Sequence, residues 1–111
     1  MQATRQQKID RLIQKDLGDI FLQYTRSMHG TLISVSEVRV TTDLSLAHIY
    51  LSIFPSERQQ EVMEQVEHDH GKIRGELGRL ERHQLRIIPE LVFHVDQTLD
   101  KMENIDRLLK Q

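Results

Sequence analysis

The chain has 111 residues, which is enough for one domain with its own core, and we expect a single domain over residues 1–111. Its 15 Lys and Arg against 17 Asp and Glu give a formal net charge of −2, which excludes a uniform polycation. The absence of cysteine excludes a disulfide framework and thiolate chemistry. The sequence has no membrane-length apolar run and no apolar signal segment, so we expect a cytoplasmic protein.

Charge is distributed unevenly along the chain. Two basic segments, residues 1–15 and 71–88, flank an acidic segment, residues 57–70. On charge alone, all three segments are typical of solvated helix faces.

The first predicted element is a helix over about residues 4–24. Apolar side chains recur there at spacings of three and four, which is the pattern of an amphipathic helix. The members of this stripe are Ile9, Leu12, Ile13, Leu17, Ile20, Phe21 and Tyr24. Thr4 is placed to cap the helix, with Gln7 completing a capping box. Residues 27–30 are predicted to form a loop.

Two strands are predicted next, over residues 32–41 and about 47–54. Both segments are rich in β-branched residues and alternate between apolar and polar side chains. The alternation changes phase near Ser36 and Glu37, which indicates a bulge. A short turn at residues 42–43 predicts an antiparallel hairpin.

The second half of the chain predicts a kinked helix, a strand and a last helix. Ser56 and Gln59 suggest a capping box for the kinked helix, and Gly71 is expected to interrupt it. Asp69 can cap a second helical segment that begins at His70. A strand is expected over about residues 87–95, with Pro89 at its start or on an edge, and a helix over about residues 98–110.

The order is therefore helix, strand, strand, kinked helix, strand, helix. This order predicts an α+β domain in which helices cover one face of a three-stranded sheet. Ser34, Arg39 and Ser52 fit the solvated face. Tyr50 and Phe54 share that outer side of their strand, and they predict either packing under a helix or a base-stacking platform. We favour packing, because stacking platforms usually have basic residues nearby on the same strand.

Three segments together resemble the ribosome-binding factor A family. Residues 33–52, ISVSEVRVTTDLSLAHIYLS, look like its hairpin, with an Asp-Leu turn and an Ala before the second apolar run. Residues 73–78, IRGELG, resemble its Ile-Arg-x-x-Leu-Gly motif. Residues 85–93, LRIIPELVF, resemble its Leu-Arg-x-x-Pro-Glu-Leu-x-Phe motif, and Asp96 follows at the expected place.

The resemblance implies a KH-like fold of type II topology, in the order α-β-β-α(kinked)-β-α. It also implies a protein without a cofactor that binds the small ribosomal subunit and its ribosomal RNA, and assists late maturation and processing of that RNA. We expect a monomer when the protein is free. The chain departs from the family at residues 69–71, Asp-His-Gly in place of Ala-x-Gly, and at residues 26–30, which replace an Asp-Pro-Arg segment.

The kink is the first candidate RNA-binding site. Glycine lets a nucleic-acid backbone come close, and the N-terminus of the following helix favours phosphate. A carboxylate at Asp69 would compete with phosphate there, so we expect binding to rest on side chains. The candidates beside the kink are His70, Gly71, Lys72, Arg74, Arg79, Arg82 and Arg86.

Several of these residues also have alternative explanations. Arg74 and Arg86 can instead pair with Glu76 or Glu90. A second phosphate contact by Arg5, Lys8 and Arg11 is no better supported than a solvated helix face.

Other classes of function find less support. Glu64, His68 and His70 raise the question of a metal, but a zinc site needs three well-placed ligands, so we expect none. The sequence has no catalytic motif, and we expect no enzyme and no catalytic residue. The main rival is a KH-like protein–protein interaction module without RNA binding, which the acidic segment favours.

Overall fold

The first helix begins where the sequence predicts. In the computed structural model, which describes residues 4–96, α1 spans Arg5–Tyr24. The Thr4 hydroxyl accepts a hydrogen bond from the backbone N–H of Gln7 at 3.1 Å, and the Gln7 side chain accepts one from the backbone N–H of Thr4 at 3.0 Å. This confirmed capping box satisfies two N–H groups at the helix end.

Three strands form one mixed sheet with β2 at its centre. β1 (Leu32–Val40) pairs antiparallel with β2 (Leu46–Phe54), and β2 pairs parallel with β3 (Glu90–Val95). The register of the hairpin shifts between Val35 and Glu37, which confirms the predicted bulge. The extra residue keeps the apolar side chains on both sides of the bulge facing the core.

One carboxylate closes the hairpin turn. Asp43 Oδ1 accepts hydrogen bonds from the Thr41 hydroxyl at 2.7 Å and from the hydroxyl and backbone N–H of Ser45 at 2.8 and 3.1 Å. These bonds, that of Thr41 first, lower the pKa of Asp43 to about 2. They also hold Leu44 at a φ of 62°, a left-handed conformation that is unfavourable for a leucine.

The kinked helix is two helices joined at Asp69. After a 3₁₀ turn over Ser56–Arg58, α2 spans Gln59–His68 and α3 spans His70–Glu81. The start of the second segment at His70 is confirmed, but the interruption lies at Asp69 rather than at Gly71, which is helical in the first turn of α3. The capping box predicted for Ser56 and Gln59 is wrong, because the 3₁₀ turn occupies that position and no side chain caps α2.

The third strand begins later than predicted. β3 starts at Glu90, whose backbone N–H donates to the carbonyl of Ser45 at 3.0 Å. The expected start at residue 87 was early because Pro89 has no N–H to give to the sheet. The buried Pro89 precedes β3, an edge strand, as the sequence predicts.

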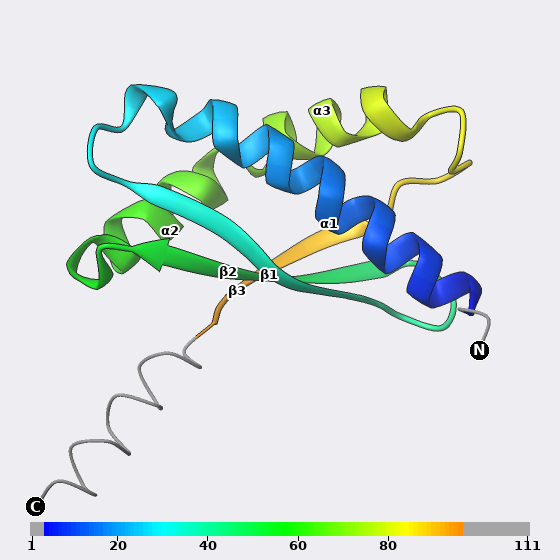
Figure 1. The fold of residues 1–111 in the computed structure, drawn as a ribbon. Helices are drawn as coiled ribbons and strands as arrows, with labels where there is room; N and C mark the ends of the chain where they lie inside the picture. Colours follow the sequence, from blue (N-terminus) through cyan, green and yellow to red (C-terminus); the bar gives the residue numbers. More distant parts are fainter. Residues whose placement is uncertain (1–3, 97–111) are drawn as a thin grey trace, which may run out of the picture.

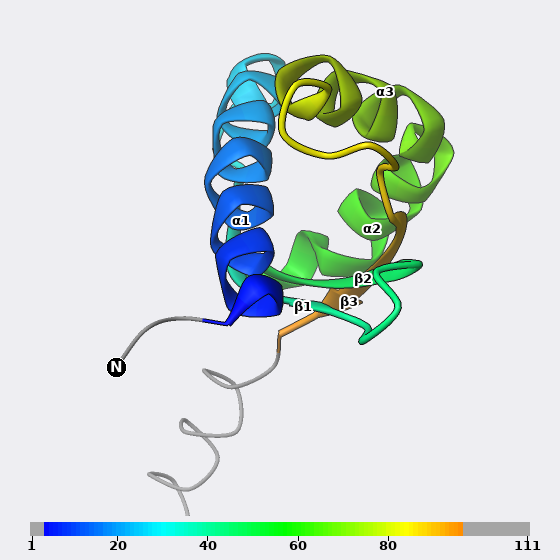
Figure 2. The ribbon, with the colours of Figure 1, turned by 90° about the vertical axis from the view of Figure 1, so that its right-hand side faces the viewer.

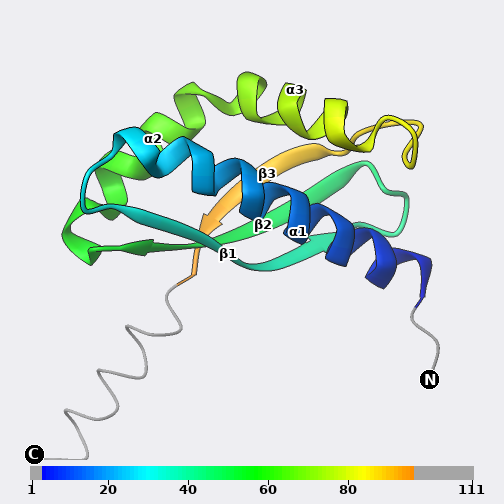
Figure 3. The same cartoon turned by 45° about the horizontal axis from the view of Figure 1, so that its top comes forward.

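The described helices all cover one face of the sheet, as predicted (Figure 1). α1 packs over β1, whereas α2 and α3 pack over β2 and β3 (Figures 2 and 3). The core lies between the two layers. Its fully buried aliphatic and aromatic members are Ile13, Leu17, Phe21, Ala47, Ile49, Leu51, Val66 and Leu77.

The other face of the sheet carries the outward side chains of the strands. Phe54 is 69% exposed, and Tyr50 is half-buried among its neighbours on this face. Packing of these two residues under a helix is therefore wrong, because the apolar positions that alternate with them already fill the covered face.

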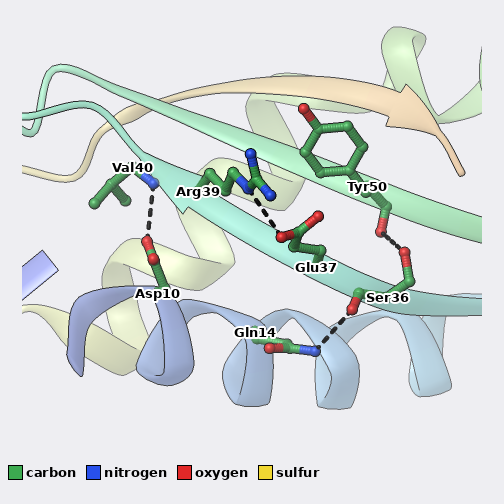
Figure 4. A network of polar contacts seen from close by, with 7 residues as sticks. All are labelled: Asp10, Gln14, Ser36, Glu37, Arg39, Val40 and Tyr50. Carbon is green, nitrogen blue, oxygen red and sulfur yellow. Dashed lines mark hydrogen bonds and ion pairs between the residues drawn. The ribbon is translucent and has the colours of Figure 1, made fainter. Parts of the chain in front are cut away.

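Polar side chains tie α1 to the edge strand β1. Asp10 accepts a hydrogen bond from the backbone N–H of Val40 at 2.8 Å (Figure 4). The Gln14 amide donates to the carbonyls of Val35 at 3.2 Å and of Ser36 at 3.4 Å, at the bulge. These bonds give edge-strand groups of β1 partners within the domain.

The helix predicted over residues 98–110 lies outside the described residues. Across residues 4–96, no helix combines the length and the apolar content that crossing a bilayer requires.

A carboxyl group is buried between α1 and α3. Glu81 is fully buried beside Asp16, and no donor in the described part of the chain reaches either of its oxygens. Burial, followed by the hydrogen bond and the negative charge of Asp16, raises the pKa of Glu81 to about 8. Glu81 is therefore mostly protonated at neutral pH.

We expect this raised pKa to make stability depend on pH. Between pH 4.5, the ordinary pKa of Glu81, and about 8, the folded state binds one proton more than the unfolded state, so the free energy of unfolding falls as pH rises. Glu81→Gln should flatten this dependence. Near pH 9 its free energy of unfolding should exceed that of the parent by about 1–3 kcal/mol. Urea unfolding at several pH values measures both effects. Glu76→Gln is the matched control on α3, and an unchanged profile for Glu81→Gln would contradict the assignment.

Candidate nucleic-acid interface

A basic groove runs along the N-terminal half of α1. It has a volume of about 520 Å³ and is closed on its far side by Gln84 and Leu85, which follow α3. Ile9 and Leu12 form the apolar part of its wall. Its cationic members, which we call the groove cations, are Arg5, Lys8, Arg11 and Lys15.

The helix geometry explains why the groove cations lie together. Spacings of three and four residues return to nearly the same side of an α-helix. All four side chains are exposed, and within residues 4–96 none makes an ion pair or a side-chain hydrogen bond. They are therefore free to bind phosphate groups, and the apolar wall beside them accommodates their aliphatic stems.

The kink is pinned to the end of α1. Asp69 Oδ2 accepts hydrogen bonds from the Tyr24 hydroxyl at 2.7 Å and from the Gln65 amide at 3.0 Å. These bonds, that of Gln65 first, lower the pKa of Asp69. Burial and the carboxylate of Asp69 raise the pKa of Tyr24. Capping of the second segment by the Asp69 side chain is therefore wrong, because its carboxylate is turned toward α1 and caps no N–H group of α3.

The corner itself is open. Gly71 is exposed, and apart from its chain neighbours and the backbone of its own helix, no described heavy atom lies within 4 Å of the position that a Cβ would occupy there. On one side of the corner lies a hollow of about 770 Å³ between α1, α2 and α3. Lys72 lines this hollow together with Asp69 and Glu76, so cationic and anionic groups alternate along it.

Arg74 faces the opposite way and holds the start of β3. Its guanidinium group donates to the carbonyl of Ile88 at 2.6 Å and to that of Pro89 at 3.1 Å, and it lies 3.8 Å from a carboxylate oxygen of Glu90. The predicted alternative, an ion pair with Glu90, is thus present beside two stronger contacts. Arg74 has a structural role that the sequence indicated only in part.

The remaining candidates beside the kink point in different directions. His70 lies against the ring of Phe93, with its Nε2 3.6 Å from Glu90. Arg79 faces a second hollow beside Asp16 and Asp19 of α1. The exposed Arg82 and Arg86 lie at and beyond the end of α3. The structure thus separates these residues, and RNA binding by them stays a prediction.

Besides the apolar wall residues Ile9 and Leu12, the structure adds three residues to the groove that the sequence did not single out for binding. Lys15 continues the spacing of the basic residues on α1, so the signal was present. Gln84 and Leu85 carried none, because only the fold brings the end of α3 back to α1. In the described part of the chain, no group of three or more His, Asp or Glu side chains is arranged to hold a metal ion, and Glu64, His68 and His70 form no such group.

Comparisons with known proteins agree on one family. A family model described as ribosome-binding factor A matches residues 5–109. Two curated relatives of that name, from Christiangramia forsetii and Flavobacterium johnsoniae, are 46% and 45% identical to this chain. Both matches cover 98% of this chain and 85% of the relative.

Solved structures share the fold. The crystal structure of ribosome-binding factor A from Thermus thermophilus has a TM-score of 0.69 at 18% identity, over 83% of this chain and 97% of that one. A homology model of the same factor, fitted into a cryo-EM map of its complex with the 30S subunit, has a TM-score of 0.66 at 21% identity, over 78% and 90%. These likenesses confirm the α+β architecture and are consistent with the KH-like fold. The family match and the curated relatives show that this chain belongs to the ribosome-binding factor A family.

Proposed function

We propose that this protein binds the small ribosomal subunit during its assembly and assists late maturation and processing of its ribosomal RNA. The family supports the proposal, as does the 30S complex of the Thermus thermophilus relative. In this proposal the protein acts in the cytoplasm as a monomer that associates with the maturing subunit.

The basic groove is the observation that carries the proposal. Its four cations lie on one helix, are exposed, and have no carboxylate partner within the described residues. Folded RNA presents closely spaced phosphates that such a row can neutralise, and the release of counterions drives the association. Contacts of this kind set affinity and position rather than sequence preference, which suits a factor that recognises the shape of a subunit.

The α3 cations Lys72, Arg79 and Arg82 are the second candidates for phosphate binding. Two of them share hollows with carboxylates, Lys72 with Glu76 and Arg79 with Asp16. Nearby negative charge reduces the attraction for phosphate. We therefore assign the groove cations the larger part of the affinity.

A protein–protein interaction module is the alternative function. A groove of about 650 Å³ between α1 and α3 is flanked by Leu22 and Leu80, which are 60% and 52% exposed. Exposed leucines beside mixed charges are typical of surfaces that bind proteins. A protein partner on this groove is compatible with RNA at the basic groove, because the two grooves lie on different stretches of α1.

Removing three groove cations should weaken binding to the subunit. We expect Arg5→Gln/Lys8→Gln/Arg11→Gln to reduce co-sedimentation with isolated small subunits, because the variant loses up to three phosphate contacts. The slope of log affinity against log salt should become shallower by about 2–3. Sedimentation at several salt concentrations measures both quantities.

The matched control removes the same charge from α3. Lys72→Gln/Arg79→Gln/Arg82→Gln should have the smaller effect on affinity and slope. If the α3 variant loses more binding than the α1 variant, the principal site lies along α3 instead. Unchanged binding in both variants would contradict an electrostatic interface with RNA.

Substitution of Arg74 should affect stability before it affects binding. Arg74→Met removes two part-buried hydrogen bonds from a charged group to backbone carbonyls, and we expect a loss of about 1–3 kcal/mol in the free energy of unfolding. Arg74→Lys should lose less than Arg74→Met, because an ammonium group can still reach one carbonyl. Urea unfolding measures stability, and sedimentation of the folded variants measures salt dependence. A shallower salt dependence with unchanged stability would show that Arg74 contacts phosphate instead.

A further inference from the structure

The open face of the sheet carries a row of rings along β2. His48, Tyr50 and Phe54 alternate with buried residues, so all three point away from the helices. The Tyr50 ring is stacked on the ring of His94 in β3, with centroids 4.9 Å apart and planes 21° from parallel. His48 Nδ1 lies 2.9 Å from His94 Nε2, within hydrogen-bond distance. We call these four residues the ring platform.

Phe54 is the least expected member of the platform. It is 69% exposed, and its ring contacts no other aromatic ring in the described part of the chain. The stack of Tyr50 on His94 can be explained as a cross-strand pair that stabilises the sheet. That explanation does not extend to Phe54, because an exposed and uncontacted phenyl ring adds little to folding.

The platform has the dimensions of a surface that receives separate planar groups. Tyr50 and Phe54 are four residues apart on one strand, which is about 13 Å. Between them lies Ser52, opposite Ser34 of β1, and both side chains are small. The rings of the half-buried Tyr50 and the exposed Phe54 are thus separated by small side chains rather than by a bulky one.

A cation lies beside the rings, as a stacking platform requires. Arg39 is opposite His48 in the hairpin register, and its side chain is 69% exposed. Figure 4 shows Arg39, Glu37 and Tyr50 on the side of the sheet that faces away from α1. Arg39 is paired with Glu37 at 2.8 Å, and Glu37 lies opposite Tyr50, so the two charges offset each other beside the rings. A basic residue thus lies beside the rings on the neighbouring strand β1 rather than on β2 itself.

We propose that the ring platform stacks unpaired bases of RNA, with Tyr50 and Phe54 as the main stacking residues. The assignment to RNA rests on the proposed function, whereas the geometry of the platform does not. A single strand fits better than a duplex, because the face offers rings and one arginine rather than a row of cations. Bases bind the ring platform, and phosphates bind the groove cations on the helical side.

The tyrosines of this chain allow a direct test of stacking. The protein has two tyrosines and no tryptophan, so in a Tyr24→Phe variant Tyr50 is the only intrinsic emitter of consequence. A short oligouridylate should quench the emission of Tyr50. A strand of the same length without bases should not, because it offers phosphates but nothing to stack.

Affinity for labelled oligouridylate gives the second readout, measured by fluorescence anisotropy in the protein without the Tyr24 substitution. Tyr50→Thr and Phe54→Thr should each weaken binding about tenfold, the loss typical of one stacked base. Tyr50→Phe keeps the ring and should bind as the parent does. Phe54→Thr changes an exposed side chain, so it tests the proposal even if Tyr50→Thr unfolds.

Equal affinity for strands with and without bases would overturn the proposal, and so would unquenched Tyr50. If the platform instead binds a protein partner or residues 97–111 of this chain, the emission of Tyr50 should stay unquenched by oligouridylate. Either failure leaves the proposed function standing as long as binding to the subunit depends on the groove cations. A loss of subunit binding by the groove variant together with normal quenching would support both proposals.

Discussion

Burial of one apolar stripe on α1 fixes the geometry on which the proposed interface depends. Ile13, Leu17 and Phe21 are fully buried against the sheet, so the helix cannot rotate about its axis without exposing them. Once this rotation is set, every third or fourth residue on the opposite side must face solvent. The groove cations occupy these positions, and their alignment is a consequence of core packing rather than of any contact between them.

The same helix also protects the edge of the sheet. β1 is an edge strand, and exposed edge groups promote pairing with other chains. Asp10 and Gln14 bind backbone groups of β1, and the Gln6 amide donates to the carbonyl of Val40 at 3.3 Å. At the other edge, Arg74 binds the two carbonyls just before β3. Polar side chains of α1 thus give edge groups of β1 partners within the domain.

Sequence reasoning succeeded where a signal is local. The period of the stripe on α1, the Thr4 cap and the phase change in β1 each depend on residues a few positions apart, and the structure confirms all three. It failed for Ser56, where a capping pattern competes with a 3₁₀ turn after Pro55. It also began β3 too early, because an apolar run continues across Pro89 although the hydrogen-bond ladder does not.

The candidate site shows a different limit. The sequence groups positively charged side chains by their nearness along the chain. In the helix, however, Lys72 and Arg74 point to different sides. Arg74 donates hydrogen bonds to carbonyls fourteen and fifteen positions further along the sequence, and Tyr24 donates one to Asp69, forty-five positions further along. Arg39 is likewise placed beside the ring platform by strand pairing alone. Contacts between residues so far apart cannot be predicted from local sequence patterns, because they depend on the topology of the fold.

The two proposed surfaces differ in the physical force they would use, and this difference bears on reversible binding. Phosphate contacts at the basic groove act over distance and weaken with salt, whereas stacking on the ring platform needs close contact and an unpaired base. The chain has a net charge of −2, so it has little general attraction for RNA beyond the groove. A protein of this kind would bind weakly to any exposed phosphates and would stay bound longer where unpaired bases also contact the ring platform. When the last single strands of a maturing RNA become paired, the ring platform would lose the unpaired bases that it binds, whereas the basic groove would still bind phosphates. Affinity would then fall because of the state of the RNA, with no change required in the protein.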